Sequence, residues 1–142
     1  MAQIQAVIEQ VGSSSSKGTV RTHSAVVDRP TVKGGTDQGP MGGEYLLIGL
    51  GGCFMSNLLA AAHARQTAIS DAKVVVSGTI EGAPDRFTAF TLSVCATCQD
   101  PHVLATLVTI AERGCIVSNT LKAVAPVSIV LQEAPADPAG SV

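Results

Sequence analysis

The stretch EYLLIGLGGCFMSNLLAAAHARQ, residues 44–66 of this 142-residue chain, decides the fold. Apolar residues occupy nearly every face of this stretch and charges are few, which is typical of a helix buried on most of its circumference. Glycines 49, 51 and 52 lower its helix propensity, and we expect them to allow a close backbone approach just before Cys53. The stretch predicts a buried central helix.

Before this helix, residues 3–11 and 19–28 favour two strands of a hairpin, joined by a polar turn at residues 12–17. Pro30 ends the second strand because proline cannot continue a ladder. Residues 34–43 are half glycine and are expected to form a loop. No linker is long enough to divide the chain, so this loop is a candidate functional segment rather than a domain boundary.

After the central helix, the pattern predicts two strands, two helices and a last strand, at residues 73–81, 86–97, 100–114, 118–123 and 126–132. Asp100 is expected to cap the first of these helices, with Pro101 at its first position and Gly114 at its end. Ser118 is the expected cap of the second. The order β-β-α-β-β-α-α-β predicts an α+β fold with the central helix packed on an antiparallel sheet.

Length and composition predict a single domain over residues 1–142, with frayed ends at residues 1–3 and 134–142. The charged fraction, 14%, lies well below the quarter that is typical of soluble domains. We therefore expect a homodimer that covers much of the surface; the alternative is a small Ala- and Gly-rich protein with a Ser/Thr surface.

Several function classes are disfavoured. A net charge of -2 argues against nucleic acid as a partner. The N-terminus lacks the charge and apolar run of a signal peptide, and residues 45–64 contain too many glycine and polar residues for a convincing membrane span. We expect a cytoplasmic protein with reduced cysteines, and nothing in the sequence requires a metal or organic cofactor.

Cys53 and Cys115 each allow two interpretations. Cys53 lies near the middle of the predicted helix, where a cysteine is either a small core residue or a nucleophile. Cys115 follows the helix-ending Gly114, a break that can present a side chain to a cleft, although a structural role is as common there. Neither residue is decisive alone.

The flanks of the two cysteines make the pair informative. The segment GPMGGEYLLIGLGGC, followed 62 residues later by GCIVSNTL, resembles the OsmC/Ohr family. That family has a Gly-Pro-x-x-x-Glu-x-Leu-Leu-x-x-Leu-Gly-Gly-Cys type of helix entry and a Cys-Pro-Val-Ser-x-x-Leu segment. With VVDRPTVKGGTDQGP at residues 26–40 and the order of elements, the resemblance covers about residues 4–133. Ile116 replaces the usual proline.

The resemblance implies an OsmC-like fold in an intertwined homodimer, with two shared active sites that each contain both cysteines. It implies a bacterial thiol-dependent peroxidase in which Cys53 attacks an organic hydroperoxide and Cys115 resolves the product as a disulfide. A dithiol reductant, a lipoyl protein in some members, then restores the pair. The alternatives are a protein that binds an apolar ligand at the dimer interface, and a cysteine-based redox sensor or sulfur carrier.

Supporting roles for Glu44 and Arg21 also come from the resemblance. The family glutamate holds an arginine that polarises thiolate and peroxide, but it follows a proline one position earlier, where this chain has Gly43. Glu44 is otherwise an acid that stabilises a helix N-terminus. The family arginine lies in the turn between the first two strands, where this chain has only Lys17. We expect Arg21, on the second strand, to replace it, unless Arg29 does so or peroxide chemistry is weakened.

Cys95 and Cys98 form a CxxC near the end of a predicted strand. Residues three apart on a strand point to opposite faces, so both are expected to be packing residues; an accessory thiol pair is the alternative, and a zinc site lacks two ligands. Apolar Leu50, Phe54 and Met55 around Cys53 favour an alkyl or lipid hydroperoxide as substrate.

Overall fold

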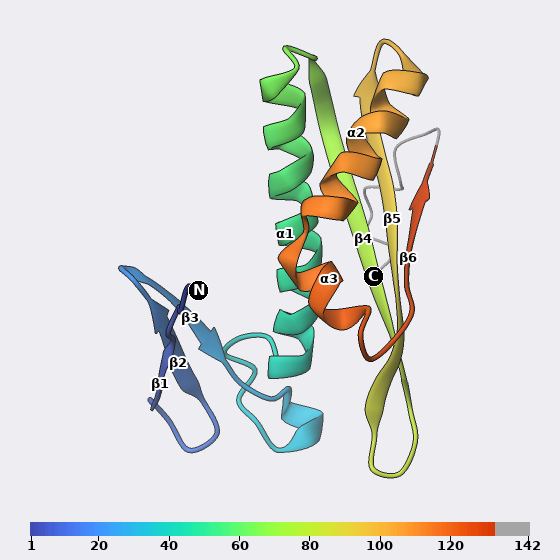
Figure 1. Cartoon of the computed structure of the whole chain (residues 1–142). Helices are drawn as coiled ribbons and strands as arrows, with labels where there is room; N and C mark the ends of the chain where they lie inside the picture. Colours follow the sequence, from blue (N-terminus) through green and yellow to red (C-terminus); the bar gives the residue numbers. More distant parts are fainter. Residues whose placement is uncertain (133–142) are drawn as a thin grey trace. The chain divides into compact units, whose positions relative to one another are not determined.

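The computed structural model describes residues 1–132 (Figure 1), so the predicted fraying at residues 134–142 lies outside the described part. The chain divides into two compact units, and the boundary in the sequence lies between Leu46 and Leu47. The prediction of a single domain over the whole chain stays a prediction.

The first unit contains a three-stranded antiparallel sheet in the order β1-β2-β3. Its strands are β1 (Val7–Gln10), β2 (Ser16–Val20) and β3 (His23–Val27). The single strand predicted over residues 19–28 is wrong, because Val20 pairs with His23 across a two-residue turn. Arg21 takes a left-handed conformation there, with φ of 56°. No glycine or asparagine marks this turn, so it could not be predicted from turn-forming residues.

A buried carboxylate organises the glycine-rich loop after β3. This carboxylate is that of Asp28, which is only 2% exposed. It accepts hydrogen bonds from the hydroxyls of Ser14 and Thr36 and from three backbone N–H groups, those of Arg29, Thr36 and Gln38. The Thr36 hydroxyl, more than any other donor, holds the pKa of Asp28 well below its usual value. The loop also includes a short 3-10 helix, η1 (Thr31–Lys33).

The long helix α1 (Gly42–Ala64) matches the predicted central helix. From residue 47 on it belongs to the second unit, where it lies along strand β4 (Figure 1). Its buried residues are Leu50, Gly51, Phe54, Leu58, Ala61 and Ala62. Ile48 is 56% exposed and Leu59 48%, so the chain by itself covers one face of a helix whose sequence is apolar on nearly all faces. By length and composition α1 could span a membrane, a property that core helices share.

The glycines of α1 differ in their surroundings. A Cβ added at Gly51 would lie 2.7 Å from Cγ2 of Val76 on β4. Added at Gly49 or Gly52 it would meet nothing within 4 Å. The predicted close approach of another backbone is therefore wrong for these three glycines: Gly51 instead makes room for the Val76 side chain, and the space beside Gly49 and Gly52 is open.

The second unit contains a mixed sheet in the order β4-β5-β6. Strands β4 (Ile69–Glu81) and β5 (Arg86–Cys98) pair antiparallel, as predicted, and β6 (Val127–Leu131) joins β5 in parallel. Parallel neighbours need a long crossover, which the helices α2 (Pro101–Gly114) and α3 (Ile116–Leu121) supply. The α+β class is confirmed.

The two crossover helices begin in different ways. Asp100 caps α2 as predicted, since its Oδ1 accepts the N–H of His102 at 2.9 Å, and Pro101 is the first helical residue. The predicted cap of α3 is wrong: the helix begins at Ile116, and its N-cap is Cys115, whose sulfur accepts the N–H of Ser118. Cysteine is an uncommon cap, and residue preferences favour serine.

Candidate functional site

The two cysteines singled out by the sequence lie together in the second unit. Cys53 is half-buried on α1, and Cys115 is fully buried between α2 and α3. Their side chains lie close enough to interact, although 62 residues separate them in sequence. Both are free thiols. The arrangement allows a disulfide to form between them once one sulfur is oxidised.

The helix junction fixes the position of Cys115. Helix α2 ends at Gly114, and Cys115 takes an extended conformation with φ of -79° and ψ of 106°. The Cys115 N–H donates to the carbonyl of Glu112 at 3.2 Å, while its sulfur accepts the N–H of Ser118 at 3.4 Å. One hydrogen bond thus fixes the backbone of Cys115 and another fixes its sulfur.

Burial raises the pKa of the Cys115 thiol, and so does its contact with Cys53. The N–H groups of Ser118 and Val117 lower it and offset the effect only in part. Since an unperturbed cysteine titrates near 8.5, Cys115 is a protonated thiol at neutral pH.

Two polar side chains near the pair were not assigned a role by the sequence. Asn57 follows Cys53 by four residues on α1, the spacing that brings side chains together on one helix face. Its amide lies 3.7 Å from the position of a Cβ built on Gly114, next to Cys115. Ser118 is 1% exposed, and its hydroxyl is, among the residues described, the one buried side-chain polar atom without a hydrogen-bond partner. The i, i+4 spacing from Cys53 was the signal that could have found Asn57.

Glu44 and Arg21 both lie in the first unit and do not contact each other. Glu44 Oε1 accepts the N–H of Met41 at 2.8 Å, the contact of a residue that caps its own helix. Arg21 is exposed in the turn between β2 and β3, rather than on a strand. Within residues 1–132 the one ion pair between described side chains joins Lys122 and Glu112 at 2.6 Å. Among residues 1–132, no arginine pairs with Glu44.

Cys95 and Cys98 lie near the end of β5, and the described residues contain no group of three or more His, Cys, Asp or Glu side chains that could hold a metal ion. Cys95 is 1% exposed, whereas Cys98 is half-buried and its thiol donates to the carbonyl of Asp100 at 3.5 Å.

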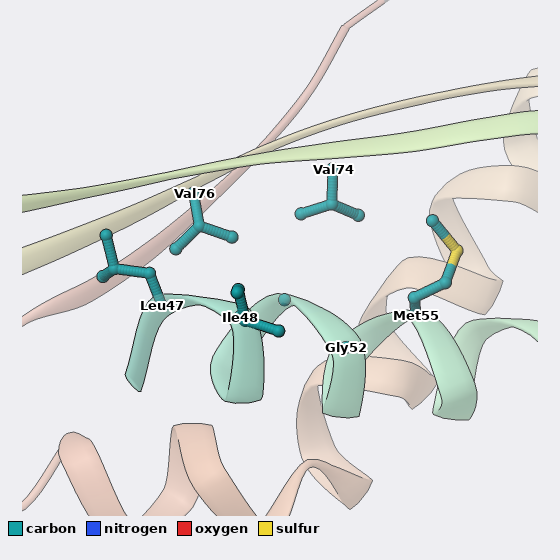
Figure 2. Close-up of a pocket in the computed structure, with 7 residues that line it drawn as sticks. Leu47, Ile48, Gly52, Met55, Val74 and Val76 are labelled. Atoms are coloured by element: carbon teal, nitrogen blue, oxygen red, sulfur yellow. The ribbon is translucent and has the colours of Figure 1, made fainter. Parts of the chain in front are cut away.

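An apolar groove of about 420 Å³ runs between α1 and β4 (Figure 2). Its lining residues are Leu47, Ile48, Gly51, Gly52, Met55, Val74 and Val76. Met55 is accessible there, as the predicted contact with an apolar substrate requires. Leu50 and Phe54, the other two apolar residues noted around Cys53, are fully buried in the core and do not line this groove.

Comparison with known proteins places this fold. The family described as OsmC-like protein matches residues 35–130. Comparison with curated proteins finds no significant sequence match.

Solved structures with the same fold come from several bacteria. An OsmC-like protein from Mycoplasma pneumoniae superposes with a TM-score of 0.80 at 16% identity, over 93% of this chain and 97% of that one. The organic hydroperoxide resistance protein OsmC from Legionella pneumophila gives 0.70 at 16%, over 93% and 99%. The organic hydroperoxide resistance protein OhrB of Bacillus subtilis gives 0.67 at 18%, over 92% and 100%.

The match spans more than half of the chain, the fold extends over nearly all of it, and both agree with the resemblance found at the two cysteine motifs. The chain therefore belongs to the OsmC-like protein family.

Proposed function

We propose that this protein is a thiol-dependent peroxidase that reduces organic hydroperoxides, with Cys53 as the attacking thiolate and Cys115 as the resolving thiol. The contact between the two thiols carries the proposal. Family membership supports it, because three structural neighbours bear the name organic hydroperoxide resistance protein.

The chemistry divides between the two sulfurs. The Cys53 thiolate attacks the distal peroxide oxygen; an S–O bond forms, the O–O bond breaks, and the alkoxide leaves as an alcohol after taking a proton. Cys115 then attacks the Cys53 sulfur, an S–S bond forms, and water leaves. A buried, protonated Cys115 leaves the first step to Cys53, since it does not compete with Cys53 for peroxide, and it gives up its proton when it attacks in the second step. A dithiol reductant, a lipoyl protein being one candidate, restores both thiols by exchange.

Glu44 and Arg21 enter the proposal on motif resemblance alone. A carboxylate that orients a guanidinium would polarise thiolate and peroxide. Glu44 caps α1 in the single chain, so a substitution of Glu44 would disturb the helix as well as any catalytic contact. The role of the cation is therefore tested by Arg21→Gln. It slows the attack on peroxide if Arg21 supports Cys53, and leaves the rate unchanged if it does not.

The assembly we propose is a homodimer in the bacterial cytoplasm. Its support is the exposed apolar surface of the chain, above all on the first unit. The residues concerned are Val7, Ile8, Val11, Val20 and Val32, each between 39% and 90% exposed. Exposed apolar surface of this extent marks an interaction site.

The experiment is peroxide consumption with dithiothreitol as reductant and cumene hydroperoxide as substrate. Cys53→Ser is expected to abolish turnover, and Cys115→Ser to prevent formation of the intramolecular disulfide. Cys98→Ser, which removes a half-buried thiol outside the pair, is the matched control and should retain activity. Full turnover by Cys53→Ser would refute the proposal.

One observation favours a second function. The apolar groove between α1 and β4 suits an apolar ligand, and Cys53 is not among its lining residues. A binding protein would hold such a ligand with equal affinity in wild type and Cys53→Ser, and would consume no peroxide.

A further inference from the structure

Two polar side chains with no hydrogen-bond partner flank the Cys53–Cys115 pair. One is the half-buried amide of Asn57, which forms no hydrogen bond with any described residue. The other is the buried hydroxyl of Ser118. A buried polar group without a partner destabilises a fold, so the Ser118 hydroxyl beside the reactive pair suggests an acceptor that is present in only part of a reaction cycle, and the half-buried Asn57 amide can donate to the same acceptor.

The geometry places Asn57 across from the helix junction. Cys53 and Asn57 are one turn apart on α1, so their side chains project to the same side. Cys53 contacts Cys115, and Asn57 lies beside Gly114, the residue before Cys115. A Cβ built on Gly114 would lie 3.7 Å from Asn57 Nδ2. The amide thus lies beside the place where both sulfurs react.

Ser118 approaches the pair from the other helix. The backbone N–H of Ser118 donates to the Cys115 sulfur at 3.4 Å, so the Ser118 side chain branches from the backbone close to that thiol. At 1% exposure it has no access to bulk water. Its hydroxyl is therefore available as a donor to a group that arrives at the thiols.

We propose that the Asn57 amide and the Ser118 hydroxyl form a binding site for the oxygen atom that Cys53 carries after attack on a hydroperoxide. The inference rests on the proposed peroxidase function and adds two catalytic residues to it. Neutral donors of this kind take the place that a cation would otherwise fill, and within residues 1–132 no cation is among the groups that shift the pKa of Cys115.

The site acts on the resolving step. In the Cys53 sulfenic acid, the oxygen accepts hydrogen bonds from Asn57 Nδ2 and Ser118 Oγ. When the Cys115 sulfur attacks, the S–S bond forms and the S–O bond breaks, so negative charge develops on the departing oxygen. The two donors stabilise this charge until a proton, in balance the one lost by the Cys115 thiol, completes a water molecule. Donors aimed at developing charge lower a barrier more than they bind the ground state.

The test compares two oxidants on Asn57→Leu and Ser118→Ala. With cumene hydroperoxide, stopped-flow and acid-quench mass spectrometry follow the sulfenic acid at Cys53 and its conversion to the disulfide. Each variant is expected to slow the conversion about tenfold, the loss of one hydrogen bond in a transition state, with attack on peroxide little changed. With diamide, which oxidises the pair without placing oxygen on sulfur, both variants should match the wild type.

Matched controls remove similar groups nearby. Ser56→Ala changes an exposed neighbour of Asn57 on α1, and Thr120→Ala removes a hydroxyl of α3 that bonds the Ile116 carbonyl; both should resolve at the wild-type rate. Equal slowing with both oxidants would show a structural role and overturn the inference, as would unchanged rates with both. A wild type that reacts with diamide but not with peroxide would instead refute the proposed function, and the inference with it.

Discussion

Cys115 does two things with one sulfur atom: it caps α3 and it contacts Cys53. Substitutions at this position therefore differ in what they test. Cys115→Ala removes the thiol and the cap together, at a cost of about 1 kcal/mol for the cap. Cys115→Ser removes the redox chemistry and keeps an acceptor for the Ser118 N–H, so it is the variant that isolates resolution.

Asp28 gives a prediction for stability against pH. Its pKa is lowered in the folded chain, so the stability that it contributes is present above the unfolded value, about 3.9, and is lost as the pH falls below it. Asp28→Asn should lower Tm by several degrees at pH 7 and should flatten the loss of stability between pH 5 and pH 2.

Thermal unfolding followed by circular dichroism across that pH range checks this. Asp37→Asn is the control, because Asp37 is an exposed carboxylate of the same loop and its backbone, with φ of 56°, suits asparagine equally well. If Asp28→Asn unfolds at the wild-type temperature at pH 7, the buried carboxylate does not organise the loop.

At the level of residues, the motifs pointed to two cysteines whose side chains interact, while the roles of Cys53, Cys115, Glu44 and Arg21 stay predictions. The flanks of Cys53 and Cys115 identified the pair before any contact was known. Arg21 was misplaced because its turn uses a left-handed residue that is not glycine or asparagine, and the cap of α3 was misassigned because a sulfur fills it. Asn57 was missed because the motif does not contain it, and only the i, i+4 spacing pointed to it.

At the scale of elements, α1 combines one covered face with one open face. Gly51→Ala is expected to destabilise the chain by about 1 kcal/mol, because overpacking against Val76 exceeds the gain in helix propensity. Gly49→Ala, with open space around it, is expected to stabilise the chain by up to about 1 kcal/mol.

Urea unfolding of the two variants side by side measures this difference. If Gly51→Ala were the more stable variant, the Val76 side chain would move aside easily and another surface would cover Gly49.

The elements α1, α2 and the β4–β5 hairpin were predictable, since each has a clear sequence pattern or cap. The parallel pairing of β6 was not, because pairing direction depends on the crossover rather than on the sequence of the strand.

At the scale of the whole molecule, the low charge and the exposed apolar residues point the same way. Light scattering after size exclusion should give twice the 14.4 kDa of one chain. Val7→Lys together with Ile8→Lys, on an exposed strand, should shift the protein toward the monomer while leaving its circular dichroism intact. A monomeric wild type at micromolar concentration would contradict the proposed assembly.

The central claim is that Cys53 and Cys115 form a peroxide-driven redox pair. Anaerobic thiol titration with intact mass, before and after one equivalent of cumene hydroperoxide, tests it most directly. We expect the loss of two of the four thiols within seconds, and a disulfide that maps to Cys53 and Cys115. Four thiols still free after minutes would contradict it.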